Sequence, residues 1–168
     1  LDVDNELEFE LLVRIIKTLN VKSRIMKTTR GGHLWFTSPK ALKNNVGINT
    51  AISIDVDIRS HGKHSQCQVK RDGEWREWLV WNDDIDVLPH WLKPINHNER
   101  FFNMSNGAGR NDKLFSYIIT LTNAGLSREQ VRETIRIIND FLFSEPLGEG
   151  ELATILRDQA FENVHESF

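Results

Sequence analysis

The apolar residues of this chain change their spacing once, close to residue 98. Before that point they alternate with polar residues in short runs, a pattern typical of half-buried strands, and one amphipathic helix lies among them. After it they recur every three or four positions, as in helices that pack against one another. We therefore expect an α+β chain, with a mixed or antiparallel sheet in residues 1–98 and a small all-α helical bundle in residues 99–168.

The chain begins with Leu1-Asp2-Val3-Asp4, which has the pattern of a buried strand at its end. Side chains alternate between the faces of a strand, so Asp2 and Asp4 point to one side and the two apolar residues to the other. Asn5 and Glu8 form a capping-box pattern, and helical spacing continues to residue 19. The segment predicts a strand, a carboxylate pair and a helix. Taken alone, it is better explained by acids that only cap the helix.

A second run also places acids on one face of a strand. Residues 51–59 alternate strictly, with the apolar residues on one face and Ser53, Asp55 and Asp57 on the other. A sheet face in water would alternate as well, but Asp is depleted in strands. Two strands that each aim a pair of Asp to one side favour a site for a divalent metal ion with oxygen ligands.

Between these acidic strands lies a basic turn, Thr29-Arg30-Gly31-Gly32-His33. Strands are expected on both sides of it, in residues 23–28 and 33–36. The glycines permit close approach of a ligand, and successive N–H groups in such a turn can bind an anion. Lys27 lies beside the turn, and residues 21–54 contain six Lys or Arg and no Asp or Glu. A plain turn is the commoner explanation of Gly-Gly, but its position between acidic strands favours phosphate binding.

Composition excludes several classes of protein. With Cys67 as its only cysteine, the chain has no internal disulfide and no cysteine spacing for zinc. No apolar run approaches the roughly 20 residues that cross a bilayer, and no signal-peptide pattern is present. The net charge of -3 argues against a wholly basic nucleic-acid binder. We expect a globular cytoplasmic protein with a local basic surface.

Several aromatic and histidine residues have two readings. The Asp72-Gly73 pair predicts a hairpin that carries Trp75, Trp78 and Trp81. These rings could stack on bases, but aromatic residues in strands more often pack, and we favour packing. His61 and His64 could be ligands, although a solvated loop is the better reading of their Gly-containing segment.

The second half predicts three short-looped helices. The first begins at Asn111-Asp112 and ends at Gly125, the second is capped by Ser127 with Gln130, and the third covers residues 149–159. Arg110 and Asn111, at the start of the first helix, could contact a phosphate. A simple helix cap explains them equally well.

The order of these motifs resembles a known family. Three segments, in this order, are similar to the three motifs of primase-polymerases of the archaeo-eukaryotic primase superfamily, in the form found in phages and mobile elements. They are Leu1-Asp2-Val3-Asp4, Thr29-Arg30-Gly31-Gly32-His33-Leu34-Trp35-Phe36 and Val56-Asp57-Ile58-Arg59. The second half resembles the helical primase C-terminal domain that often follows such a catalytic domain. The resemblance starts at Gly109-Arg110-Asn111-Asp112 and continues through Ala124-Gly125-Leu126-Ser127 to Pro146-Leu147. Members of the family have sequence before the first motif, so residues 1–98 are expected to lack the N-terminal part of the catalytic domain.

The resemblance implies a DNA primase/polymerase that makes primers for phage or mobile-element DNA replication by template-directed, metal-dependent nucleotidyl transfer. Its implied cofactor is Mg²⁺ or Mn²⁺, and its implied partners are single-stranded DNA, nucleoside triphosphates and a replicative helicase domain or protein, in the cytoplasm of a bacterial host. The implied catalytic residues are Asp2, Asp4, His33 and Asp57. The implied metal ligands are Asp2, Asp4 and Asp57, with Asp55 as the alternative third ligand. The nucleotide would be bound by Lys27, Arg30, Gly31, Gly32 and His33, and nucleic acid by Arg110 and Asn111.

Two other classes remain as alternatives. One is a non-catalytic module, derived from a primase, that binds nucleic acid or a protein partner. The other is a rolling-circle replication nuclease, which needs a His-hydrophobe-His pair and a tyrosine nucleophile. The histidines give no such pair, and the only tyrosine, Tyr117, lies in an apolar helical run.

Overall fold

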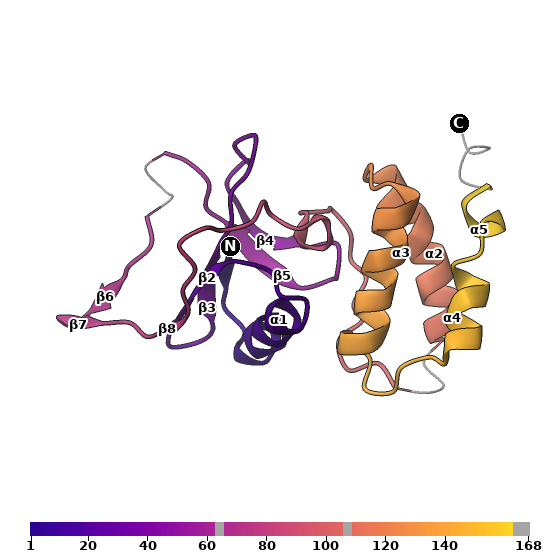
Figure 1. Cartoon of the computed structure of the whole chain (residues 1–168), viewed down its shortest axis with the longest axis horizontal. Coiled ribbons are helices and arrows are strands. Elements are labelled where there is room, and N and C mark those ends of the chain that lie inside the picture. Colours follow the sequence, from indigo (N-terminus) through magenta and orange to yellow (C-terminus); the bar gives the residue numbers. More distant parts are fainter. Residues whose placement is uncertain (63–65, 106–108, 163–168) are drawn as a thin grey trace. The chain divides into compact units, whose positions relative to one another are not determined.

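The computed structural model of the chain describes residues 1–62, 66–105 and 109–162. The chain forms two compact units (Figure 1). The first contains Leu1–Ile48 and Asp55–Pro89, and the second contains Asn49–Ile54 and His90–Phe168. In the described part of the chain, no helix has the length and apolar character needed to cross a membrane.

The first unit is built on a six-stranded sheet with strand order β4-β5-β1-β3-β2-β8. Its strands are β1 (Asp2–Val3), β2 (Arg24–Lys27), β3 (Gly32–Trp35), β4 (Asn45–Asn49), β5 (Asp55–Ile58) and β8 (Trp78–Val80). The short strand β1 lies inside the sheet, antiparallel to β3 on one side and to β5 on the other. The mixed α+β architecture with an antiparallel sheet is as predicted.

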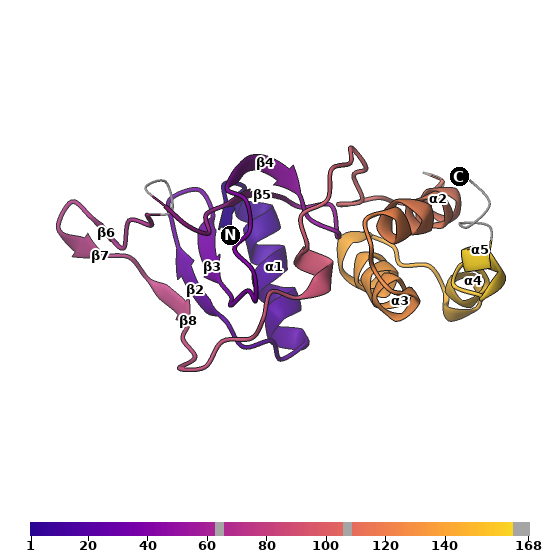
Figure 2. The same cartoon turned by 90° about the horizontal axis from the view of Figure 1, so that it is seen from above.

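One face of this sheet packs on helix α1 (Glu6–Thr18) (Figure 2). The helix begins at Asn5, whose side chain accepts a hydrogen bond from the backbone N–H of Glu8 at 3.2 Å. The buried residues of the helix are Phe9, Leu11, Leu12, Ile15 and Ile16, and those of the sheet face are Val3, Ile25, Leu34, Val56 and Ile58. Because side chains alternate along a strand, the opposite face carries Asp2, His33 and Asp57. Leu7 and Leu19, expected in the apolar stripe of the helix, are exposed instead.

The strand predicted in residues 51–59 is wrong in its first half, since β5 contains only Asp55–Ile58. Before it, the chain makes a turn in which Thr50 N–H donates to the carbonyl of Ile54 at 2.9 Å, and Ser53 has a φ of 67°. Ser53 therefore does not share a face with Asp55. Its hydroxyl instead donates to the carbonyl of Glu99. The alternating isoleucines arise because this turn is buried in the second unit.

The Asp72-Gly73 turn is confirmed, with positive φ at both residues. It joins β6 (Lys70–Arg71) and β7 (Glu74–Trp75), which form a separate two-stranded sheet. The hairpin is shorter than predicted, because β8 leaves it and pairs with β2 of the main sheet.

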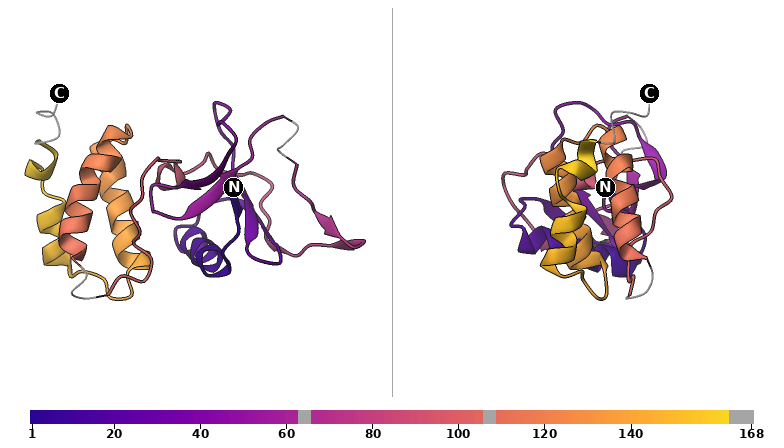
Figure 3. Two further views of the ribbon diagram at one scale, coloured as in Figure 1. Left: turned by 180° about the vertical axis from the view of Figure 1, so that it is seen from behind. Right: turned by 90° about the vertical axis from the view of Figure 1, so that its right-hand side faces the viewer.

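The second unit is helical (Figure 3). Its elements are η1 (His90–Leu92), α2 (Arg110–Asn123), α3 (Arg128–Ile137), the π-helical turn η2 (Ile138–Leu142), α4 (Glu149–Ile155) and α5 (Gln159–Glu162). The capping box of Ser127 and Gln130 is present at the start of α3. The predicted third helix is two helices, because the chain turns between Ile155 and Gln159.

The first unit ends at Pro89, and the chain from His90 onward belongs to the second unit. The predicted division into a catalytic domain (1–98) and a primase C-terminal domain (99–168) stays a prediction. Polar contacts tie the segments on the N-terminal side of residue 98 to α2. The Tyr117 hydroxyl donates to the carbonyl of Ala51 at 2.9 Å and lies 2.9 Å from His97 Nε2. The ammonium of Lys93 donates to the carbonyl of Ala124 at 2.5 Å. Long-range contacts of this kind leave no signal in local apolar spacing.

Candidate functional site

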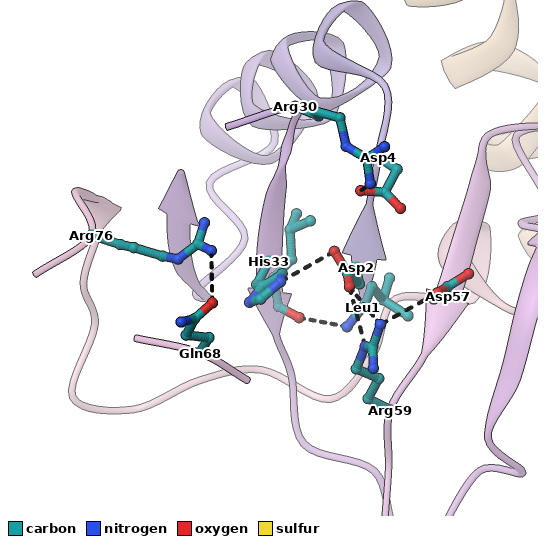
Figure 4. A network of polar contacts seen from close by, with 10 residues as sticks. Leu1, Asp2, Asp4, Arg30, His33, Asp57, Arg59, Gln68 and Arg76 are labelled. Atoms are coloured by element: carbon teal, nitrogen blue, oxygen red, sulfur yellow. Dashed lines mark hydrogen bonds and ion pairs between the residues drawn. The ribbon is translucent and has the colours of Figure 1, made fainter. Parts of the chain in front are cut away.

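The sheet register brings three distant residues into one row. Asp2 of β1 lies opposite His33 of β3 and also opposite Asp57 of β5. Directly opposed residues of antiparallel strands point to the same face. All three side chains therefore leave the sheet on the face that α1 does not cover (Figure 4). Asp2 of the first motif segment thus pairs with one residue from each of the other two segments.

Asp2 is held between two cationic side chains. One carboxylate oxygen, Oδ1, lies 3.2 Å from His33 Nε2, and the other, Oδ2, lies 3.0 Å from Arg59 Nη2. The same Arg59 nitrogen is 3.4 Å from Asp57 Oδ2, so one guanidinium bridges the two carboxylates (Figure 4). The second oxygen of Asp57 accepts a hydrogen bond from the Gly47 N–H at 2.9 Å.

These contacts set the protonation states at the site. Burial alone would lower the pKa of His33, but the hydrogen bond and charge of Asp2, together with Cys67, raise that pKa to about 9. Burial would raise the pKa of Asp2, but His33 and then Arg59 lower it. The hydrogen bond with His33 also lowers the pKa of the Cys67 thiol. At neutral pH His33 is therefore an imidazolium that is paired with the ionised carboxylate of Asp2.

Asp4 and the basic residues of the turn lie at the edge of this row. Asp4 is exposed just after β1 and contacts Arg30 at 3.2 Å. Lys27 is 3.6 Å from Glu6 of α1. Asp2 and Asp4 line the same cavities, as their placement on one side of the strand predicts.

Two cavities adjoin the row and differ in charge. The first, of about 530 Å³, has Asp2, Asp4 and His33 in its wall, together with the arginines Arg30, Arg59, Arg71 and Arg76. The second, of about 350 Å³, is lined by acids and includes Asp2, Asp4, Glu8, Asp55 and Asp57. The site thus places a cationic cavity beside an acidic one, with Asp2 in the wall of both.

Arg71 and Arg76 were missed by sequence reasoning. Arg71 donates to the Thr29 hydroxyl at 2.5 Å, and Arg76 donates to Gln68 Oε1 at 3.4 Å. The Asp72-Gly73 signal located their hairpin, but nothing local in the sequence places that hairpin beside residues 28–30.

Close packing accounts for both glycines of the turn. A β-carbon on Gly31 would lie 2.0 Å from the carbonyl oxygen of Val3, and one on Gly32 would lie 2.2 Å from the ring of Phe9. Neither glycine is among the residues with positive φ. The turn therefore needs glycine to let the strand approach β1 and α1. A role of these N–H groups in nucleotide binding stays a prediction.

The predicted metal ligands fit a divalent cation in type. Asp2, Asp4 and Asp57 offer the oxygen donors that Mg²⁺ and Mn²⁺ prefer. Among the described residues, however, no three His, Cys, Asp or Glu side chains are arranged to hold a metal ion. The positive charge between Asp2 and Asp57 is that of Arg59. A metal ion between these carboxylates would require the guanidinium to move away.

The remaining candidates have other surroundings. Asp55 lines the acidic cavity, two residues before Asp57 on β5. His61 is exposed, and His64 lies outside the described residues. In the second unit, the guanidinium carbon of Arg110 is 5.8 Å from the centre of the Phe143 ring, and Asn111 donates to Glu151 at 3.4 Å. These contacts are as expected for residues that stabilise the start of α2, whose N-cap is Gly109.

Comparison with known proteins identifies part of the second unit. Residues 106–157 match the family model described as Primase C terminal 1 (PriCT-1). No curated protein and no solved structure matches the chain. The match covers 52 of the 168 residues and lies within the helices that resemble a primase C-terminal domain in sequence.

Proposed function

We propose that the chain is a DNA primase/polymerase that joins nucleotides on a single-stranded DNA template. The observation that carries the proposal is the strand pairing of Asp2, which lies opposite His33 on one neighbouring strand and opposite Asp57 on the other. Residues from three motifs, which together span Asp2 to Asp57 in the sequence, form one polar row beside a cationic cavity. The PriCT-1 match supports the same conclusion independently, because it concerns only the second unit.

In this proposal each group of residues has a separate role. The imidazolium of His33 and the guanidinium of Arg30 bind the triphosphate, with Lys27 as a further charge and with Arg71 and Arg76 also in the wall of the cavity. Asp2, Asp4 and Asp57 hold Mg²⁺ or Mn²⁺. When bound, such an ion supplies positive charge to the attacking and leaving oxygens of the phosphoryl group.

The biological setting belongs to the same proposal. The family resemblance implies primer synthesis for phage or mobile-element replication. This would take place in a bacterial cytoplasm, together with a helicase domain or protein.

Primer synthesis tests the proposal directly. The chain is incubated with single-stranded DNA, labelled nucleotides and Mn²⁺ or Mg²⁺, and compared with Asp2→Asn and with Asp84→Asn, which changes an exposed acid of the same unit. We expect labelled products from the wild type and from Asp84→Asn, and none from Asp2→Asn or with a chelator. Failure of the wild type with both metals would overturn the proposal.

A second candidate is a module that binds nucleic acid or a partner without catalysis. The observation in its favour is Arg59, which already neutralises Asp2 and Asp57. The same experiment separates the two, since this module would bind DNA and incorporate no nucleotide. A tyrosine-dependent nuclease gains no support, because Tyr117 is 1% exposed and burial raises its pKa.

A further inference from the structure

The polar row continues toward the edge of the sheet as a row of aromatic rings. In the register of β2, Met26 lies opposite His33 of β3 and also opposite Trp78 of β8, while Arg24 lies opposite Trp35. Opposed residues share a face, so His33, Trp35 and Trp78 all stand on the face that α1 leaves uncovered. Strand β8 ends the sheet on this side.

The rings are in contact from one to the next. The centre of the His33 ring is 5.7 Å from that of Trp35, which is 5.1 Å from that of Trp78, and Trp78 is 4.8 Å from Trp81. These distances are typical of interacting aromatic pairs. A continuous aromatic surface therefore leads from the histidine of the site to the edge of the sheet.

Packing alone does not explain this surface, because the side chains become more exposed to solvent from His33 toward Trp81. Trp78 is 36% exposed and Trp81 is 55% exposed. The guanidinium of Arg24 lies 4.4 Å above the centre of the Trp81 ring and donates to the carbonyls of Asn82 and Asp83, each at 3.0 Å. Trp81 is thus held by a cation over its ring, and more than half of its surface stays exposed to solvent.

The surroundings select the class of ligand. Proteins that bind single strands combine aromatic rings, on which bases stack, with cationic groups that follow the phosphates. Here the aromatic row meets, at His33, the cavity whose wall contains Arg30, Arg71 and Arg76. Bases inside a duplex cannot reach such rings, whereas those of a single strand can.

We propose that Trp35, Trp78 and Trp81 form a stacking platform for single-stranded nucleic acid, which leads the strand to the His33 site. The identification of that strand as the template rests on the proposed function. The binding itself does not depend on catalysis, so the two can fail separately.

The test measures the affinity of the full chain for a short fluorescein-labelled DNA strand by fluorescence anisotropy over a range of salt concentrations. Loss of one stacking ring is worth about 5- to 150-fold in affinity. We expect Trp81→Ala to weaken binding by an amount in this range and to leave the slope of log affinity against log salt unchanged, because a ring releases no counterions. Trp81→Phe should retain most of the affinity.

Matched variants keep the result interpretable. Trp75→Ala removes another exposed tryptophan, on β7 of the separate two-stranded sheet, and should bind as the wild type does. Glu10→Gln, which changes an exposed acid on α1, should also bind as the wild type does. Thermal unfolding of each variant shows whether it is folded, and Trp81 is the first choice because it is the most exposed ring of the platform. The inference is overturned if the wild type does not bind the strand, if Trp81→Ala binds as tightly as the wild type, or if Trp75→Ala loses as much.

Discussion

Asp2 and His33 are direct partners on the antiparallel strands β1 and β3, with His33 Nε2 3.2 Å from Asp2 Oδ1. Their side chains are only 12% and 11% exposed. Strand β1 contains two residues, yet it pairs on both sides, so backbone hydrogen bonds to β3 and β5 fix the position of the Asp2 carboxylate. This arrangement suits a site whose geometry must be held before a ligand arrives.

Arg59 controls the charge balance of the row. Replacement by Gln leaves Asp2 and Asp57 facing each other without the cation between them, so we expect a lower melting temperature in the presence of a chelator. We also expect Mn²⁺ to raise the melting temperature of Arg59→Gln by more than that of the wild type, because no guanidinium then competes with the metal.

Differential scanning fluorimetry with and without Mn²⁺ measures both effects. Lys17→Gln, an exposed change of the same charge on α1, serves as the control. Equal Mn²⁺ shifts in wild type, control and Arg59→Gln would show that Arg59 does not occupy the place of a metal ion.

Gly31 tests the packing explanation of the Gly-Gly turn. Because its β-carbon would meet the backbone of Val3, Gly31→Ala should destabilise the first unit by about 1–3 kcal/mol or more. Gly150→Ala, in α4, meets nothing within 4 Å and should be neutral or stabilise by up to roughly 1 kcal/mol. Urea unfolding measures both. If Gly31→Ala keeps full stability and loses only nucleotide binding, the turn is a ligand-binding feature and not a packing requirement.

His90 gives the second unit a pH dependence. Burial lowers the pKa of His90, an effect that the nearby Glu133 opposes but does not cancel. The unfolded chain therefore takes up a proton near pH 6.5 that the folded chain does not, and the stability present above that pH is lost as the pH falls toward the folded pKa. The slope contributed by one such group is at most about 1.4 kcal/mol per pH unit.

Urea unfolding between pH 5 and pH 8 checks this. His90→Gln should flatten the decrease in stability below pH 6.5, while His61→Gln, which changes an exposed histidine, should follow the wild type. A wild-type slope in His90→Gln would mean that other groups cause the decrease.

The sequence predicts those parts of the fold whose physical cause is local. Asn5 and Ser127 begin helices because each side chain accepts a hydrogen bond from a nearby N–H, and both caps are present. Asp72 and Gly73 turn the chain because they tolerate positive φ. The alternation of faces also places Asp2 and Asp57 on the open face of the sheet.

The features of the fold and of the site that the sequence does not predict have long-range causes. Ile52 and Ile54 alternate like strand residues, but they are buried in the second unit by contacts with residues beyond 90, such as the hydrogen bond from Ile52 N–H to the carbonyl of Trp91. Arg71 and Arg76 enter the site through the placement of their hairpin, which no local motif predicts. Likewise, the sequence Gly31-Gly32 alone does not show whether the glycines are needed for close packing or for ligand binding.

The roles of Asp57 and Asp55 test the central claim most directly. Both are on β5, about 7 Å apart along the strand, and it is Asp57 that lies opposite Asp2 and 3.4 Å from Arg59. The measurement is the rate of nucleotide incorporation by Asp57→Asn and by Asp55→Asn, at saturating Mn²⁺ and on the same DNA template. The account predicts a loss of more than about a hundredfold for Asp57→Asn, since several kcal/mol of transition-state stabilisation would be removed, and substantial retained activity for Asp55→Asn. Full activity of Asp57→Asn would contradict it.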